Sequence, residues 1–472
     1  MEEGIVECLR LIHVSLDLLL SDFTVQIQGF TSAGVPFISF GGTPYYLDFK
    51  QLTHTGIFGT TRSGKSVLVS TRILSALSAH MPVIVVDYSV TYVDLMQFFG
   101  VPVIDVTRES LNLVEVPDAR RLAPETAQQI IGMWKRMVLE MLVIMVIGQT
   151  EETTQLNKTI RNILELALTR FSEDEAILSR FHLAYDQGIE SNVWSAMPVL
   201  ADFLGFCDAS HFSQFGGIVE DACSTIQLAI SAWSTKPGIG EAISRPSSYV
   251  THSRATLFLL SGLGDDAGAA VMAGISQLAV YRMLALHDSC YVAIDEASIL
   301  MTYRPLNNMV GILFAEGLKR GARIDLIAQD CSTAYNSPNG PKIFDNMDNF
   351  VIGRLQPAAK RSFVQYLQVP EHLISLNTQE SFFPNGTYSN WLIAQAGRYT
   401  HCRWYANRFI LAIAANNPNE RQARAMVMAL YPNKFAGIKT FAEVLMVAIQ
   451  GGRDVLDVAQ EHCQQQASQT VS

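Results

Sequence analysis

The sequence of 472 residues has few of the features that mark secreted, metal-binding or membrane-spanning chains. Its seven cysteines are scattered and form no C-x-x-C pair, which argues against a zinc site and favours reduced thiols. The start, Met1-Glu2-Glu3, is acidic, whereas a secretory signal begins with a basic segment. The most apolar run, Met137 to Ile147, contains Glu140 and is well short of the ~20 residues that a membrane-spanning helix needs. These absences predict a cytoplasmic chain, whose membrane association, if any, comes through partners or through an unseen segment.

Positive charge is also scarce. The formal net charge is −10, and no dense basic loop is visible. An acidic chain is not drawn to a nucleic-acid backbone by bulk attraction, although a local basic lining would still permit binding. Nucleic acid is therefore a possible partner but not the favoured one. About half of the residues are apolar and 17% are charged, which is a globular composition with material for a large core.

Short apolar runs alternate with helical patterns through much of the chain. Pro82 to Asp87 and Cys290 to Asp295 are continuous apolar runs, which are typical of parallel strands covered on both faces, and each run ends on an acid. Helices are expected over Val67 to Ala79 and Gly268 to Leu286, and a further strand over Ile324 to Gln329. This alternation predicts an α/β core with a mainly parallel sheet.

Changes in the pattern of strand and helix signals along the chain predict five segments. Residues 1–50 read as an N-terminal helix and a small β layer, with strands at Phe23 to Ile27 and Pro36 to Phe40. Residues 51–116 and 251–430 form the two parts of the core, and 117–250 form an inserted, mostly helical subdomain without strand–helix alternation. Residues 431–472 form a helical tail. Late strands are expected near 391–395, 403–405 and 410–414, and late helices over 417–430 and 439–463.

The clearest motif has the form G-x-x-x-x-G-K-S and lies between an apolar strand and a helix. In such a phosphate loop, backbone N–H groups and the positive end of the helix bind phosphate. Lys65 would reach the β- and γ-phosphates of ATP, and the Ser66 hydroxyl would bind Mg²⁺. Arg62 stands where glycine is common, and either faces solvent or contacts nucleotide or a neighbouring subunit. The predicted nucleotide-binding residues are Gly59, Thr60, Thr61, Arg62, Ser63, Gly64, Lys65, Ser66 and Val67.

Two adjacent carboxylates, Asp295 and Glu296, close another apolar strand. Neighbouring residues at a strand end point in different directions, so one can hold Mg²⁺ while the other meets the attacking water. We assign the metal role to Asp295 and the general-base role to Glu296. Asp87 also closes an apolar strand and is an alternative metal ligand, but no second acid follows it.

One amide and several cations complete the predicted site. Gln329 closes the strand expected beside the acidic one, where it would sense the γ-phosphate or orient water. Charge on the transferring phosphoryl group also requires a cation, often an arginine from a neighbouring subunit. Arg354 and Arg361, at and just after a core strand, are the preferred candidates. The other candidates are Lys319, Arg320, Arg323 and Arg398.

The motifs occur in the order G-T-T-x-S-G-K-S, V-I-V-V-D, I-D-E-A, then K-R-G-A before Gln329. This order resembles the HerA/FtsK superfamily of hexameric P-loop motors. Residues 87–92, the helical insert and the late β section resemble the TraC class of conjugation and type IV secretion ATPases, nearest to the DotO (IcmB) group of Dot/Icm-type systems. Members carry a large N-terminal docking domain, and the short segment before the loop here fits a motor-domain fragment. The residues after Asp87 also depart from the class pattern.

The resemblance implies a RecA-like P-loop NTPase core that uses ATP and Mg²⁺. It further implies a hexamer that works with other secretion-system ATPases and inner-membrane channel subunits, and that energises machine assembly or substrate transfer. Two alternatives stay open at this point. One is a DNA translocase or coupling protein of the same superfamily, and the other is a scaffold that binds ATP only to hold a ring together. The intact Lys65, Ser66 and Glu296 weigh against the scaffold.

Overall fold

The computed structural model describes residues 34–48, 54–148, 154–215, 217–249, 254–262, 267–297, 301, 304–395 and 397–471. Within these residues, one 11-stranded sheet runs in the order β2-β1-β11-β10-β9-β3-β8-β7-β4-β6-β5. The strands are β1 (Gly34–Ser39), β2 (Pro44–Asp48), β3 (His54–Phe58), β4 (Val83–Asp87), β5 (Val103–Asp105), β6 (Ala255–Leu259), β7 (Cys290–Ile294), β8 (Ala322–Ala328), β9 (Met347–Ile352), β10 (Tyr388–Gln395) and β11 (Arg398–Tyr405).

The part of the sheet from β9 to β5 is parallel throughout. Strand β3 pairs with β8 on one side and β9 on the other, while β7 lies between β8 and β4. The carboxyl ends of parallel strands meet at one edge of a sheet, so the segments that follow β3, β8 and β7 are brought together there. The predicted α/β class with a mainly parallel sheet is confirmed.

The remaining strands form an antiparallel wing. β9 pairs with β10, β10 with β11, and β11 with β1. The N-terminal β layer is therefore the edge of the central sheet, and the strand predicted at 36–40 is present as β1. The helix and the strand predicted before residue 34 lie outside the described residues.

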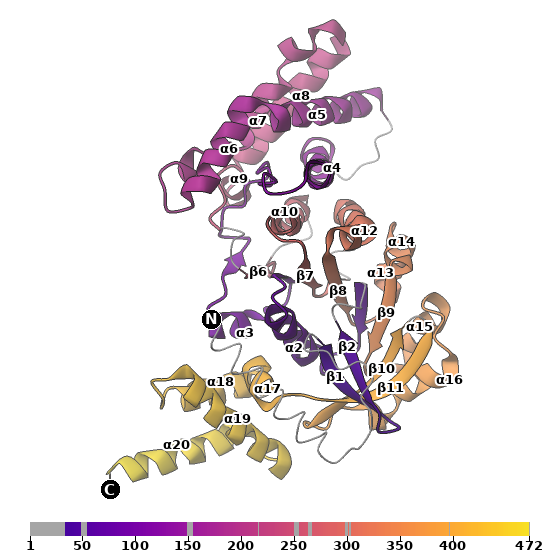
Figure 1. Ribbon diagram of the computed structural model, residues 1–472, viewed down its shortest axis with the longest axis vertical. Helices are drawn as coiled ribbons and strands as arrows, with labels where there is room; N and C mark the ends of the chain where they lie inside the picture. Colours follow the sequence, from indigo (N-terminus) through magenta and orange to yellow (C-terminus); the bar gives the residue numbers. More distant parts are fainter. Residues whose placement is uncertain are drawn as a thin grey trace.

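Helices cover both faces of the sheet (Figure 1). Alternate residues of each buried strand point to opposite faces. On β4, Val83 and Val85 pack in the cluster that contains α2 and the C-terminal helices, whereas Ile84 and Val86 pack in the cluster that contains α10 and α12. The helices of these layers are α2 (Lys65–Ser78), α3 (Val93–Phe98), α10 (Ala267–Leu286), α12 (Arg304–Gly317), α13 (Ser332–Tyr335), α14 (Gly340–Asp345), α15 (Lys360–Tyr366), α16 (Glu371–Ile374), α17 (Arg408–Ala414), α18 (Pro418–Met428), α19 (Lys434–Gly451) and α20 (Val455–Val471).

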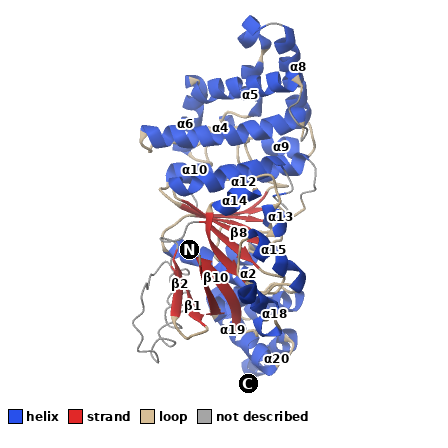
Figure 2. Cartoon of the chain, turned by 90° about the vertical axis from the view of Figure 1, so that its right-hand side faces the viewer, coloured by secondary structure: helices blue, strands red, loops and turns tan. Residues whose placement is uncertain are grey.

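A helical layer lies beyond α10, on the far side from the sheet (Figure 2). It contains α4 (Pro124–Ile147), α5 (Gln155–Glu173), α6 (Glu175–Gln187), α7 (Leu200–Leu204), α8 (Gly217–Ser234) and α9 (Ile239–Ile243). Its buried side chains, including Trp134 of α4, belong to the same apolar cluster as α10, so layer and core share one interior. No described helix combines the length and apolar composition needed to cross a bilayer.

Two late elements differ from the prediction. Residues 410–414 were expected to be a strand but belong to helix α17, whose N-cap Asn407 accepts the Phe409 N–H at 2.9 Å. A short apolar run has the same pattern in a buried strand and in a buried helix, and only the cap distinguishes them. The single helix expected over 439–463 is divided into α19 and α20, because Gly452 adopts φ +61° and ends α19.

Candidate functional site

The phosphate loop joins β3 to α2 and is attached to the ends of both neighbouring strands. The Gly59 N–H donates to the Ala328 carbonyl at 3.3 Å, at the end of β8. On the other side, the Thr60 N–H donates to the Arg354 carbonyl at 2.8 Å, just after β9. These bonds hold the loop at the carboxyl edge of the sheet.

Helix α2 begins directly after the loop with its first N–H groups uncapped by a side chain. The N-cap is Gly64, whose φ of +94° is a conformation that side chains rarely adopt. The hydroxyls of Thr60 and Ser63 are buried and have no hydrogen-bond partner within the described part of the chain. Unpaired donors at a helix start, with the positive end of the helix dipole, form a ready anion site.

Lys65 extends its side chain back along the loop. Its Nζ donates to the carbonyls of Gly59 and Thr60, the latter at 3.1 Å. Burial lowers the pKa of Lys65, and the negative charges of Asp295 and Glu296 oppose that lowering. Both carboxylates therefore lie within electrostatic reach of the Lys65 ammonium, although more than two hundred residues separate them in the sequence.

Asp295 follows β7 and is almost completely buried. Its pKa is raised to about 7, first by burial and then by the charges of Asp87 and Glu296, while the Glu296 N–H and Lys65 act in the opposite direction. The Glu296 N–H donates to the Asp295 carboxylate at 2.9 Å. A buried carboxylate among other acids is poorly compensated by the protein alone, which is the environment that a bound cation would relieve.

Glu296 is partly exposed and has φ +50°, an unusual conformation for a residue with a side chain. Such backbone strain is concentrated at functional sites. Gln329, at the end of β8, donates from Nε2 to Glu296 Oε1 at 3.4 Å. The prediction that the glutamine strand lies beside the acidic strand is confirmed, because β7 and β8 are paired.

Asp87 has a structural task at the end of β4. Its carboxylate accepts the N–H groups of Ser89 at 2.7 Å and Tyr92 at 3.0 Å, which closes the turn into α3. Burial raises its pKa, and these hydrogen bonds lower it. Asp87 is close enough to act on the pKa of Asp295, so it contributes to the electrostatics of the acidic pair.

The two preferred arginines differ in their surroundings. The Arg354 guanidinium lies over the Phe383 ring, 3.2 Å from its centroid, and the Arg354 carbonyl holds the phosphate loop. Arg354 is therefore a neighbour of the loop in its own chain. Arg361 is on α15 and is exposed.

The other candidate cations are in two places. Lys319 and Arg320 form the turn before β8, and Arg323 is near the start of that strand. They lie at the edge of the sheet opposite the phosphate loop, so they do not face the loop of their own chain. Arg398 is exposed at the start of β11.

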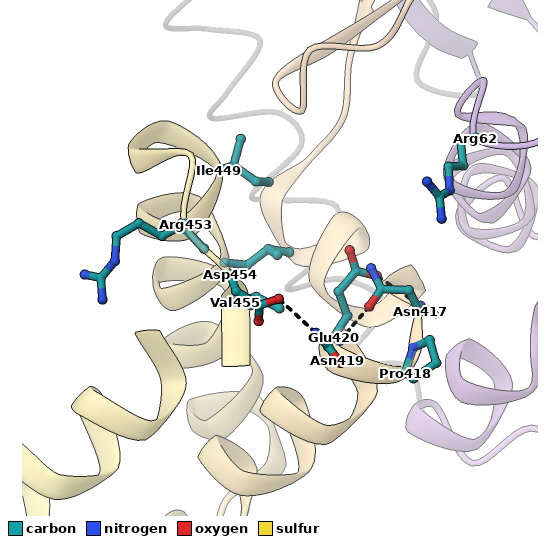
Figure 3. A pocket seen from close by; sticks show the side chains of 11 residues that line it. Arg62, Asn417, Pro418, Asn419, Glu420, Ile449, Arg453, Asp454 and Val455 are labelled. Carbon is teal, nitrogen blue, oxygen red and sulfur yellow. Dashed lines mark hydrogen bonds between the residues drawn. The ribbon is translucent and has the colours of Figure 1, made fainter. Parts of the chain in front are cut away.

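The tip of the phosphate loop faces the C-terminal helices across a cavity of about 470 Å³. Arg62, with φ +64°, is exposed on one side, and the starts of α18 and α20 form the other side (Figure 3). There Asn417 and Glu420 cap α18 through reciprocal hydrogen bonds. Thr61 is exposed beside Arg62, and Ser66 and Val67 occupy the partly exposed first turn of α2.

Part of the sequence and the fold of the chain are similar to those of known proteins. Residues 30–118, which contain the phosphate loop, match the FtsK/SpoIIIE family. The structure of VirB4 from Thermoanaerobacter pseudethanolicus is similar, with a TM-score of 0.55 and 13% identity over 80% of this chain and 97% of that one. The plasmid coupling protein TrwB in complex with ADP and Mg²⁺ gives a TM-score of 0.47 and 15% identity over 83% of this chain and 91% of that one. Comparison with curated protein sequences gives no match.

The chain has a RecA-like P-loop NTPase fold, similar to that of VirB4. In this P-loop NTPase fold, β3 between β8 and β9 carries the phosphate loop, and the acidic strand lies beyond the glutamine strand.

The donor set of this P-loop NTPase site fits a nucleotide and Mg²⁺. The uncapped N–H groups, Lys65 and two buried hydroxyls are hydrogen-bond donors that suit a polyphosphate. Hard oxygen ligands suit Mg²⁺, and Asp295 and the Ser66 hydroxyl are the groups that would hold it.

Sequence reasoning missed a set of buried polar groups below the site. Arg72, Tyr291 and Asp325 are almost completely buried and hydrogen-bonded to one another, below the edge of the sheet that carries the phosphate loop. The signal was present, because an arginine and an aspartate interrupt segments that are otherwise apolar. Charged residues are almost never fully buried unless paired, and the sequence alone does not show the pairing.

Proposed function

We propose that this chain hydrolyses ATP with Mg²⁺, using Lys65, Ser66, Asp295, Glu296 and Gln329. The observation that carries the proposal is the parallel order β3-β8-β7, which brings the loop with Lys65, then Gln329, then Asp295 and Glu296 to one edge of the sheet. The effect of both carboxylates on the Lys65 pKa agrees with this placement. A phosphate-binding cation, a metal-binding acid and a base within one site are the parts that phosphoryl transfer to water needs.

Each residue has a defined task in this proposal. Glu296 accepts a proton from the water that attacks the γ-phosphorus, and the bond from that phosphorus to the ADP oxygen breaks. Gln329, bonded to Glu296, orients the water. Lys65 and the N–H groups at the start of α2 offset the negative charge that develops on the phosphoryl oxygens. Mg²⁺, held by Ser66 and Asp295, would supply further positive charge.

Two substitutions test this assignment. Glu296→Gln should bind ATP and lose turnover by roughly 100-fold or more, because it removes the base and keeps the shape. Lys65→Ala should lose ATP binding itself. The measurements are steady-state phosphate release and binding of a fluorescent ATP analogue. Glu220→Gln, on the exposed surface of α8, is the matched control.

If Glu296→Gln hydrolysed ATP at the parental rate, the assignment of Glu296 as general base would be contradicted, and a scaffold that only binds ATP would be favoured. Tight ATP binding by Lys65→Ala would remove the loop assignment.

We infer further that the chain is a motor of a type IV secretion or conjugation system, nearest to the DotO (IcmB) group. The motif order and the fold shared with VirB4 support this inference. A hexamer in the cytoplasm, held at the inner membrane by channel subunits and other secretion ATPases, would use the hydrolysis for machine assembly or substrate transfer.

The alternative is a DNA translocase or coupling protein of the same superfamily. The FtsK/SpoIIIE match over residues 30–118 fits it equally well, but the net charge of −10 does not favour it. Phosphate release measured with and without double-stranded DNA, at several salt concentrations, separates the two. Salt-sensitive stimulation by DNA would favour the translocase, and indifference to DNA favours the secretion motor.

A further inference from the structure

Each of the three elements that carry the site has a second polar residue deeper in the fold. On helix α2, Arg72 follows Lys65 by two turns and so lies on the same face. On strand β8, Asp325 precedes Gln329 by four positions, and residues an even number apart share a strand face. Tyr291 stands in the same relation to Asp295, at the end of β7.

These deeper residues are bonded to one another. Arg72 donates from Nη2 to Asp325 Oδ1 at 2.8 Å and from Nε to Oδ2, a bidentate pair. The Tyr291 hydroxyl donates to the same Oδ2. Arg72 and Asp325 are each 1% exposed, and Tyr291 is fully buried. We call these residues the buried triad.

The surroundings of the buried triad are apolar. Ile57, Ala293 and Ile327 belong to the cluster on this face of the sheet. A buried ion pair in such a place is weak evidence for stability, because an apolar pair of similar volume is often as stable or more so. A bidentate pair with a third hydrogen bond does, however, fix the relative orientation of the elements that it joins.

We propose that the buried triad positions α2 against β7 and β8, and thereby keeps Lys65, the acidic pair and Gln329 at their working separation. The proposal rests on the proposed ATP hydrolysis. The triad residues do not touch nucleotide in this account, so they are positioning residues and not catalytic ones. Misplacement by about 1 Å can cost on the order of 100-fold in rate, so small losses of orientation should be visible in kcat.

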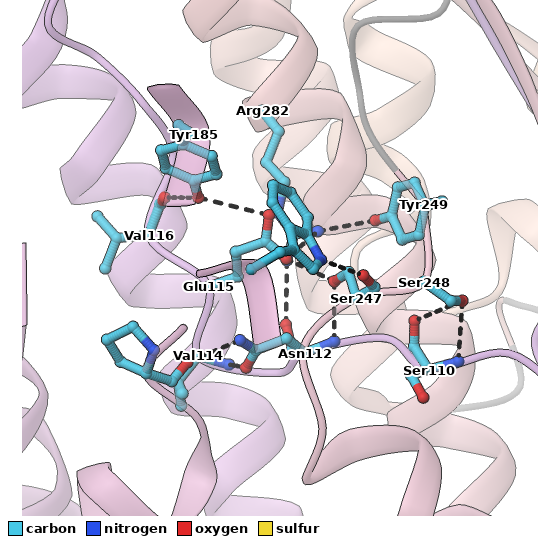
Figure 4. A network of polar contacts seen from close by, with 12 residues as sticks. Ser110, Asn112, Val114, Glu115, Val116, Tyr185, Ser247, Ser248, Tyr249 and Arg282 are labelled. Carbon is cyan, nitrogen blue, oxygen red and sulfur yellow. Dashed lines mark hydrogen bonds and ion pairs between the residues drawn. The ribbon is translucent and has the colours of Figure 1, made fainter. Parts of the chain in front are cut away.

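A second buried network of the same chemistry provides a control. Arg282 on α10 pairs with Glu115 at 3.1 Å, both 3% exposed, and Arg282 also donates to the Tyr249 hydroxyl at 2.8 Å (Figure 4). Ser247 donates to Glu115 as well. This network joins the chain segments on either side of the helical layer to α10, and none of its residues belongs to the elements of the site.

The experiment compares Tyr291→Phe with Tyr249→Phe. Each substitution removes one hydroxyl from a buried arginine–carboxylate pair and keeps the ring. We expect Tyr291→Phe to lower kcat by about 10-fold, with less than about a twofold change in ATP affinity. Tyr249→Phe should keep the parental kcat. Equal kcat in Tyr291→Phe and the parent, or equal losses in both variants, would overturn the proposal.

A triple variant separates positioning from stability. Arg72→Met with Asp325→Leu and Tyr291→Phe replaces the whole polar set by apolar groups of similar size, so the unfolding temperature should stay near that of the parent. We expect the kcat of this variant to be lower than that of the parent even though its stability is preserved. A parental kcat would show that the pair served only the fold.

Hydrogen exchange provides a readout that needs no turnover. The amides of residues 64–68 and 294–297 should exchange faster in Tyr291→Phe than in the parent. In Tyr249→Phe the same amides should exchange at the parental rate. An inactive parent would contradict the proposed function, whereas unchanged exchange in Tyr291→Phe would contradict the positioning role.

Discussion

At the scale of single residues, unusual backbone conformations gather around the phosphate loop and the acidic pair. Arg62, Gly64 and Glu296 all have positive φ. For Gly64 the geometry leaves little alternative, because an added Cβ would lie 3.2 Å from the Ser389 hydroxyl oxygen. The left-handed region costs an ordinary residue roughly 1–2 kcal/mol. The shape of the loop therefore has a local cost in stability, and glycine at position 64 keeps that cost small.

Gly64→Ala should weaken ATP binding by about 10-fold, because both the strained φ and the contact with Ser389 shift the start of α2. Gly452→Ala is the control. It has φ +61° at the end of α19 and open space around the added Cβ. Both variants should unfold at a lower temperature, but only Gly64→Ala should change the dissociation constant of a fluorescent ATP analogue. Unchanged affinity in Gly64→Ala would contradict this account.

At the scale of elements, the junction between α10 and the helical layer depends on a buried charge pair. Removing Glu115 would leave Arg282 buried without its carboxylate, and breaking such a pair typically costs about 3–5 kcal/mol. Glu115→Ala should therefore lower the urea midpoint strongly. Glu173→Ala breaks an exposed pair with Lys135 and should barely change it. Similar midpoints for the two variants would show that the junction does not depend on this pair.

The elements also show which parts of the fold the sequence could reveal. The phosphate loop is contiguous and has its own motif, and buried parallel strands such as β4 and β7 are apolar runs that end on an acid. The pairing of β1 with β11 connects segments more than 350 residues apart, and no local pattern specifies it. Helix α17 was mistaken for a strand because a run of five apolar residues has no readable period.

Similar reasoning applies to the site. The position of Gln329 near Glu296 was predictable, because the strand that it ends was expected to lie beside the acidic one. The buried triad was not, because the partners of Arg72 are brought to it only by the folded sheet.

At the scale of the whole molecule, the proposed ring would bring an arginine to the site from outside the chain. Exposed Arg361 suits that role better than Arg354, whose guanidinium lies over Phe383. If subunits complete one another, turnover per chain should rise with protein concentration.

Arg361→Ala should reduce turnover by roughly 1000-fold, within the range attributed to an arginine finger. Mixing it with the Lys65→Ala chain should recover part of the activity, because a mixed interface has one intact loop and one intact arginine. Arg245→Ala, at an exposed position near the helical layer, should have no effect. Full turnover by Arg361→Ala alone would exclude it as the finger.

The position of β3 has a consequence for synthesis of the chain. The phosphate loop is synthesised before both strands that flank β3, because β8 and β9 come after residue 321. Loop closure over such a separation is slow, and partly made chains expose apolar strand edges. A ribosome must therefore pass residue 352 before the phosphate loop can have both of its neighbouring strands, and a product truncated before β8 would carry the phosphate-loop sequence without the strands that position it.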